Sequence, residues 1–286
     1  MSKEQTQIAI SCFGSTDAGV RRTGNEDAFL IADLSEAEQE LRSHRQSALA
    51  GKTEILLAVS DGMGGAAAGE LASGLAVNAV REALRELPEN PGCAGRLKRA
   101  VEIANERVWQ AARQQPQHPG MGATLTAALA QDGHVCIAQI GNSRAYLIRD
   151  HKVTQLTRDQ SLVQNLIEAG VLTVEQAPNF PQRHAILQAL GHTPAIKVAM
   201  TRFALSPGDY LLLCSDGLSD TLNEAEIRFS IENSETLEDA CWLLIELANA
   251  RGGEDNITVV LARVEGTLID GEDEYIRELN RDRLAA

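Results

Sequence analysis

Two apolar segments of this sequence end in the same three residues, Ser-Asp-Gly. Residues 56–65 read LLAVSDGMGG, and residues 211–218 read LLLCSDGL. The apolar runs predict buried strands, and a buried carboxylate is costly unless it has a partner of opposite charge. The two aspartates at these strand ends, Asp61 and Asp216, therefore indicate a shared cation. Gly62 follows Asp61 directly, and a glycine leaves its own carbonyl open to a ligand.

Length and charge limit the class of protein. The 286 residues suffice for a large core, and a net charge of −14 argues against binding to nucleic acid or to an anionic membrane. No apolar run reaches the ~18 residues that span a membrane, and the N-terminus lacks a signal-peptide pattern, so we expect a cytoplasmic protein. The five cysteines contain no CxxC pair, and we interpret them as buried small hydrophobic residues.

Helical segments come in pairs between groups of strands. Strands are expected at 7–14, 28–34, 54–60, 123–131, 134–141, 144–150, 152–156, 196–205, 209–216 and 257–264. Helices are expected at 69–87, 96–115, 161–170, 173–177, 223–233 and 237–250. Several strands are joined by tight turns, such as the Asp-Gly pair at 132–133, which favours antiparallel pairing. This pattern predicts an α+β fold rather than strict βαβ alternation.

Three segments stand apart from this pattern. Residues 35–53 are polar and predict an exposed excursion, residues 160–190 combine short helical pieces with a proline-bearing loop, and residues 266–286 form a charged tail. We expect residues 1–265 to form one domain.

Further carboxylates lie where a loop meets an apolar strand, namely Glu26, Asp27 and Asp255. Carboxylates and a backbone carbonyl are hard oxygen ligands, which suit Mg²⁺ or Mn²⁺. A bridging carboxylate can serve two ions about 4 Å apart, and such a pair activates water and polarises a phosphoryl group. Arg22 precedes Glu26 on the same loop, and a guanidinium can bind phosphate with two hydrogen bonds.

Taken together and in order, these segments resemble the type 2C metal-dependent serine/threonine protein phosphatases in their compact bacterial form. The resemblance covers roughly residues 7–264. The segments that carry it are TDAGVRRTGNEDAF, AVSDGMGGAAAGE, MGATLTAAL, IGNSRAYLIR, QLTRDQSLVQNLIEAG, ILQALG, GDYLLLCSDGLSD and EDNITVVLARV. It implies a four-layer α-β-β-α sandwich of two antiparallel sheets flanked by helix pairs. It also implies hydrolysis of phosphoserine and phosphothreonine on proteins.

The resemblance assigns metal-binding roles residue by residue. Asp61 matches the carboxylate that bridges two metal ions, Mn²⁺ or Mg²⁺, and the carbonyl of Gly62 matches a ligand of one of them. Asp216 and Asp255 match ligands of the other ion. At the position that corresponds to 142, members of the family often have an aspartate that helps to bind a third metal ion. Here it is Asn142, a poorer ligand, so the sequence predicts two ions and argues against a third.

The remaining assignments concern water and phosphate. Glu26 and Asp27 match the acidic pair that holds metal-bound waters, and Arg22 matches the phosphate-binding arginine. The implied mechanism has no covalent enzyme intermediate, because a hydroxide activated at the two-metal site attacks phosphorus directly. Residues 160–190 match a flap beside the site. The implied partners are phosphorylated proteins, such as a bacterial serine/threonine kinase and its targets, and we expect a monomer.

The sequence departs from the family at two further positions, and rival interpretations exist. Ala66 stands where bacterial members commonly carry histidine, and His184 stands where asparagine is expected.

Asn142 and Ala66 favour the main alternative, a catalytically weakened module that binds a phosphoprotein. Residues 62–67 also fit the glycine pattern of dinucleotide-binding folds, but Asp61 would place a negative charge against a pyrophosphate. No segment has the ligand spacing of an EF-hand.

Overall fold

The computed structural model describes residues 9–34, 40–41, 46–49, 54–90, 92–114 and 120–266. Its strands form two sheets, in which every recorded strand pair is antiparallel. The first sheet has the order β10-β9-β12-β13-β1-β4, and the second has the order β11-β8-β7-β5-β2-β3, with β6 paired to β5. The strands are β1 (Ala9–Asp17), β2 (Asp27–Asp33), β3 (Glu40–Leu41), β4 (Gln46–Leu49), β5 (Ile55–Met63), β6 (Gly122–Ala123), β7 (Leu125–Gln131), β8 (His134–Ile140), β9 (Arg144–Arg149), β10 (Lys152–Gln155), β11 (Ala199–Ala204), β12 (Tyr210–Cys214) and β13 (Ile257–Glu265).

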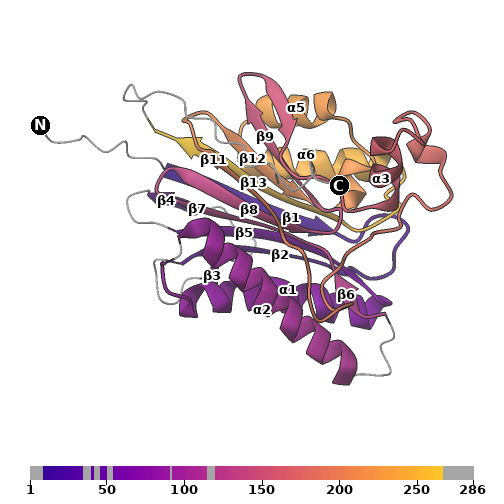
Figure 1. The fold of residues 1–286 in the computed structure, drawn as a ribbon. Coiled ribbons are helices and arrows are strands. Elements are labelled where there is room, and N and C mark those ends of the chain that lie inside the picture. The colour runs from indigo at the N-terminus through magenta and orange to yellow at the C-terminus, as the bar shows by residue number, and fades with distance from the viewer. Residues whose placement is uncertain are drawn as a thin grey trace, which may run out of the picture.

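Helices cover the outer face of each sheet (Figure 1). The helices are α1 (Ala66–Glu86), α2 (Cys93–Gln114), α3 (Leu162–Glu168), α4 (Asp216–Ser219), α5 (Glu224–Glu232) and α6 (Leu237–Ala250), with a 3₁₀ helix at Ala177–Asn179. The long pair α1 and α2 packs on the second sheet, and α5 and α6 pack on the first. The fold is therefore the expected α+β sandwich with its four layers in the order α-β-β-α.

Three apolar clusters hold the layers together. Leu84 and Leu97 lie between the α1–α2 pair and the second sheet, and Leu213 and Val260 belong to the cluster between the two sheets. A third cluster, which includes Leu244, joins the first sheet to α4, α5 and α6. Each sheet is buried on both faces, which explains why β5 and β7 read as continuous apolar runs rather than as alternating patterns.

Local sequence signals account for several element boundaries. Asp132 and Gly133 both adopt positive φ angles, 50° and 74°, as a two-residue hairpin between β7 and β8 requires. Helix α5 begins with a capping box, in which the Asn223 side chain accepts from the backbone of Glu226 and the Glu226 side chain accepts from that of Asn223.

The structure adds two short strands to the expected elements and corrects two expectations. Segment 35–53 contributes β3 and β4 to the edges of the two sheets, and its other residues lie outside the described part of the chain. Of the helix expected at 173–177, only Ala177 becomes helical, as the first residue of the 3₁₀ turn. Strand β12 ends at Cys214, so Asp216 begins α4 instead of ending a strand. Residues 267–286, most of the expected charged tail, lie outside the described residues.

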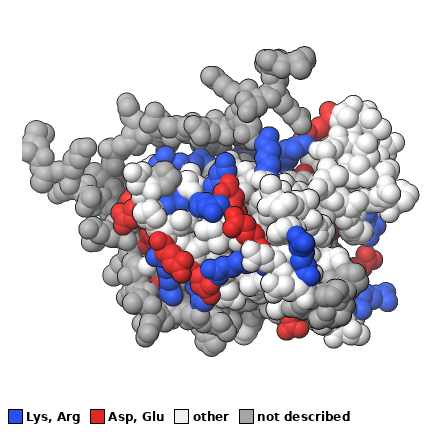
Figure 2. All heavy atoms as spheres, turned by 60° about the horizontal axis from the view of Figure 1, so that its bottom comes forward, with Lys and Arg blue, Asp and Glu red and all other residues white. Residues whose placement is uncertain are grey.

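The outer face of α1 and α2 carries both signs of charge (Figure 2). Arg107 forms an ion pair with Glu82, and Arg99 Nη1 lies 3.2 Å from Glu102 Oε2. This mixture differs from the one-sign basic stripe that a nucleic acid needs. Within the described residues, no helix combines the length and the apolar character that crossing a bilayer demands.

Candidate active site

Asp61 lies near the end of β5, where this strand pairs with the start of β2. Asp61 is the cross-strand partner of Asp27, so the two carboxylates project from neighbouring positions at one edge of the second sheet. The backbone N–H of Asp61 donates to Thr124 Oγ1 at 2.9 Å, and this hydroxyl also bonds with Ser143 Oγ at 2.7 Å. Thr124 is buried and thus supports the Asp61 backbone from inside the core.

Gly62 permits a close approach of three backbone segments. A Cβ atom at this position would lie 2.0 Å from the carbonyl oxygen of Gly69 in α1 and 2.7 Å from that of Glu26. The Gly62 N–H donates to the Glu26 carbonyl at 3.1 Å. The sequence interpretation attributed this glycine to an open carbonyl. The structure adds a second reason, because any side chain here would collide with the first turn of α1.

Asp27 is buried and only partly satisfied. Its Oδ2 accepts a 2.6 Å hydrogen bond from the Thr258 hydroxyl, whereas its Oδ1 is buried and has no hydrogen-bond partner within the described part of the chain. Burial raises the pKa of Asp27 to about 6. Glu26, the preceding residue, has its pKa raised by burial as well. An unpartnered buried carboxylate oxygen is the kind of group that a cation or a water molecule would satisfy.

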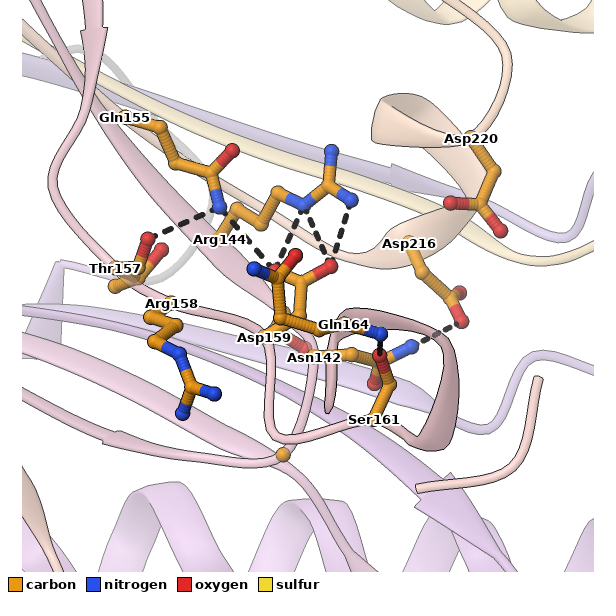
Figure 3. A network of polar contacts seen from close by, with 12 residues as sticks. Asn142, Arg144, Gln155, Thr157, Arg158, Asp159, Ser161, Gln164, Asp216 and Asp220 are labelled. Carbon is orange, nitrogen blue, oxygen red and sulfur yellow. Dashed lines mark hydrogen bonds and ion pairs between the residues drawn. The ribbon is translucent and has the colours of Figure 1, made fainter. Parts of the chain in front are cut away.

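Asp216 reaches the same place from the opposite sheet, as the first residue of α4. Its Oδ2 accepts a 2.8 Å hydrogen bond from Asn142 Nδ2 (Figure 3). Burial, followed by repulsion from Asp220, raises the pKa of Asp216 to about 7. Asp216 also belongs to a cluster with His184 and Asp220, in which one possible ligand atom of each residue lies within 4.8 Å of the others. The amide at position 142 therefore supports Asp216 as a hydrogen-bond donor.

Arg22 and Asp255 form an ion pair at the rim. Arg22 Nη2 lies 2.7 Å from Asp255 Oδ2, and the arginine side chain is half exposed. The second oxygen of Asp255 accepts from the N–H of Asn256 at 2.9 Å. The arginine that was expected to bind phosphate is thus within reach of the carboxylates, but in this structure its partner is one of them.

The acidic residues influence one another strongly. The pKa of Asp61 is raised well above its usual value by burial and then by the charges of Asp216, Asp27, Asp255 and Glu26. All five predicted carboxylates therefore converge, although they come from both sheets. Arg22 pairs with Asp255, and this ion pair balances the charge of one of the five carboxylates. The arrangement favours binding of divalent cations by oxygen ligands.

The sequence analysis did not identify Asn256, whose side chain hydrogen-bonds to the loop between β1 and β2. Its Nδ2 donates to the carbonyls of Ala18 and Gly24, each at 2.9 Å, and its Oδ1 accepts from the Glu26 N–H at 2.8 Å. The residue is 5% exposed. Its direct succession to Asp255 in EDNITVV was the available signal, since a polar residue at the start of a buried strand needs internal partners.

The segment expected to be a flap lies beside the acidic group. It follows Asp159, which accepts three hydrogen bonds from Arg144, at 2.9, 3.0 and 2.6 Å (Figure 3). At its far side, Arg183 Nη2 lies 3.2 Å from Glu254 Oε2. The segment is thus anchored both to β9 and to the loop that carries Asp255.

Comparisons with known proteins agree with this geometry. The family model described as Protein phosphatase 2C matches residues 42–248. The serine/threonine protein phosphatase PstP of Mycobacterium tuberculosis is 42% identical over 210 residues, which are 73% of this chain and 40% of that protein. The chain thus spans about 40% of the length of this relative. Protein phosphatase PhpP of Streptococcus pneumoniae is 38% identical over 86% of this chain and 94% of its own length.

A solved structure gives the same result for the fold. The crystal structure of the catalytic domain of PstP in complex with two manganese ions superposes with a TM-score of 0.74 at 34% identity, covering 90% of this chain and 99% of that one. The resemblance inferred from the sequence is therefore confirmed, and this chain belongs to the protein phosphatase 2C family.

Proposed function

We propose that this chain is a metal-dependent protein phosphatase that hydrolyses phosphoserine and phosphothreonine on proteins. The observation that carries the proposal is the convergence of Asp27, Asp61 and Asp216 beside the Arg22–Asp255 pair. The names of the relatives support it, because PstP and PhpP are both called protein phosphatases.

The residues present fit a pair of divalent cations. The donor set is carboxylate and carbonyl oxygen, and one buried oxygen of Asp27 has no partner among the described residues. The pKa values of Asp27 and Asp61 are raised first by burial and also by neighbouring carboxylates, which a bound cation would offset. We propose that Asp61, the Gly62 carbonyl, Asp216 and Asp255 hold two ions, Mn²⁺ or Mg²⁺, with Glu26 beside them. The bound ions would lower the pKa of water and offset the charge of the phosphoryl group.

The protein's own groups have distinct tasks in the reaction. Asp27, whose Oδ2 is fixed by Thr258, would accept a hydrogen bond from water through its free Oδ1 and orient it toward phosphorus. Arg22 would exchange one carboxylate oxygen of Asp255 for the phosphate oxygens of the substrate. In the net reaction, water cleaves the P–O bond, the serine or threonine oxygen takes a proton, and inorganic phosphate leaves.

Domain limits, location and partners belong to the same proposal. We propose that residues 1–265 form one phosphatase domain, that residues 160–190 act as its flap, and that two ions rather than three are bound, since Asn142 already donates to Asp216. We further propose that the protein acts as a monomer in bacterial cytoplasmic signalling, on a serine/threonine kinase and its targets.

The alternative function is a catalytically weakened module that binds a phosphoprotein. The Asn142–Asp216 hydrogen bond favours this alternative.

A paired assay separates these functions. Hydrolysis of p-nitrophenyl phosphate and of a phosphothreonine peptide is measured with Mn²⁺, with Mg²⁺ and with EDTA. The parent should be active only with metal, Asp216→Asn should lose at least about 100-fold in kcat/KM, and the exposed control Asp150→Asn should match the parent. A folded parent that binds the phosphopeptide without hydrolysing it would favour the binding module.

A further inference from the structure

The five cysteines fall into two classes in this structure. Cys12, Cys136, Cys214 and Cys241 are buried, whereas Cys93 is partly exposed. Burial alone raises the pKa of Cys12 to about 12, and burial is also the main reason for the raised pKa of Cys214. These two thiols behave as the inert small hydrophobic residues that the sequence predicts. Cys93 and Cys136 differ, because each is the other's neighbour.

Backbone pairing places the two thiols together. Cys93 is the first residue of α2, and its Sγ donates to the Leu129 carbonyl at 3.4 Å. Leu129 in β7 is the cross-strand partner of Cys136 in β8. Cys136 faces the cluster between the helices and the second sheet, and Cys93 packs against that same cluster. Each thiol influences the pKa of the other, as expected for two sulfur atoms held on either side of Leu129.

The surroundings favour a thiolate in this pair. The pKa of Cys136 is lowered, first by its interaction with Cys93 and also by the positive charge of Arg202, whereas the interaction with Cys136 raises the pKa of Cys93. Cys136 is therefore the member of the pair that can take up a proton. Arg202 is exposed on β11 and is the cross-strand partner of Cys136. Cys93 also lies at the positive end of the α2 dipole, which stabilises a negative sulfur. Cys93 is the partly exposed member of the pair, so we expect a small oxidant to approach the pair from its side.

We propose that Cys93 and Cys136 form a redox modification site, at which a peroxide converts the two thiols to a disulfide joining the start of α2 to β8. The Cys136 thiolate takes the proton of the Cys93 thiol, the sulfur of Cys93 attacks a peroxide oxygen, the O–O bond breaks, and a sulfenic acid on Cys93 and one water form. The sulfur of Cys136 then attacks the sulfenic sulfur, which releases a second water. The two thiols together lose two electrons and two protons, and hydrogen peroxide is reduced to two waters.

The site is independent of the proposed phosphatase chemistry. None of its residues belongs to the acidic group around Asp61, and its formation requires neither metal nor substrate. The disulfide would close a long loop that contains all of α2 and the β7 hairpin, which restricts the unfolded chain. Oxidation should therefore raise the melting temperature of the protein by several degrees.

The test is a peroxide titration of the full chain, prepared reduced and in EDTA. Thiols are counted after denaturation, and linked peptides are identified by mass spectrometry without reduction. The parent should lose two of its five thiols, yield one peptide pair joining Cys93 to Cys136, and recover both thiols with dithiothreitol. The Cys93→Ser variant should keep its four thiols at the same dose, and the matched control Cys214→Ala should still lose two.

Other results would overturn the proposal. These are a Cys93 sulfinic acid with Cys136 still reduced, a dimer linked through Cys93, or five intact thiols after treatment. A melting temperature that oxidation leaves unchanged would also contradict it. Since the parent alone gives the linked peptide, the outcome stands even where a variant folds poorly.

Discussion

Asp27 and Asp61 are direct cross-strand partners at the paired ends of β2 and β5. Both have raised pKa values, for which burial is the main cause, and the charge of Asp27 adds to the rise in the pKa of Asp61. Like charges placed opposite each other weaken a sheet, so their presence at the end of the ladder indicates a function other than stability. The repulsion explains why this edge of the second sheet is a suitable place for divalent cations.

Arg22 should contribute to substrate binding more than to folding. Its ion pair with Asp255 is half exposed and is worth little to stability. Arg22→Ala should raise the KM for a phosphothreonine peptide about 10-fold or more, because a charge-assisted hydrogen bond to phosphate contributes about 1.5–3 kcal/mol. The measurement is steady-state kinetics, with the neighbouring exposed Arg21→Ala as control. An unchanged KM in Arg22→Ala would exclude this role.

Asn256 should be necessary for both stability and metal affinity. Replacing it by alanine leaves the Glu26 N–H and the carbonyls of Ala18 and Gly24 without their partner. We expect Asn256→Ala to lower the free energy of unfolding by about 2–4 kcal/mol, measured by urea denaturation in EDTA. The exposed Asn233→Ala removes a single hydrogen bond and should cost less than about 1 kcal/mol. Equal costs for the two variants would contradict the assignment.

The metal-free protein should lose stability as the pH rises. The pKa of Asp216 is about 7 in the folded chain and 3.8 in its ordinary environment. Between these values the unfolded chain is ionised while the native carboxyl holds its proton, so raising the pH favours unfolding. In EDTA, Asp216→Asn should therefore melt above the parent, and the difference should grow between pH 5 and pH 8. A difference that does not change with pH would contradict the raised pKa.

Most of the site could be predicted because each carboxylate adjoins an apolar strand. Asp61 and Asp216 follow apolar runs, and Asp255 precedes one. Such runs form buried strands, and the ends of neighbouring strands meet at one edge of a sheet. The differences between the prediction and the structure are local. The two Ser-Asp-Gly segments look alike, yet Asp61 lies within β5 and Asp216 begins α4, because β5 continues to pair with β2 and β6 whereas β12 stops at Cys214.

Contacts between distant segments could not be predicted. The hydroxyl of Thr258 donates to Asp27, which lies 231 residues away in the sequence, and no local sequence pattern predicts this contact. The same holds for Asn256 and for the contact of Cys93 with the β7–β8 ladder. The edge strands β3 and β4 are short and lie in a polar segment, so neither length nor alternation marks them.

The most direct test of the account is the stoichiometry of Mn²⁺ binding, measured by isothermal titration calorimetry on the metal-free chain. The proposed site predicts two ions for each chain and the loss of at least one in Asp61→Asn, since this carboxylate is proposed to serve both ions. The exposed control Asp150→Asn should bind two ions with unchanged affinity. A folded parent that binds no Mn²⁺, or an Asp61→Asn variant that binds it like the parent, would contradict the account.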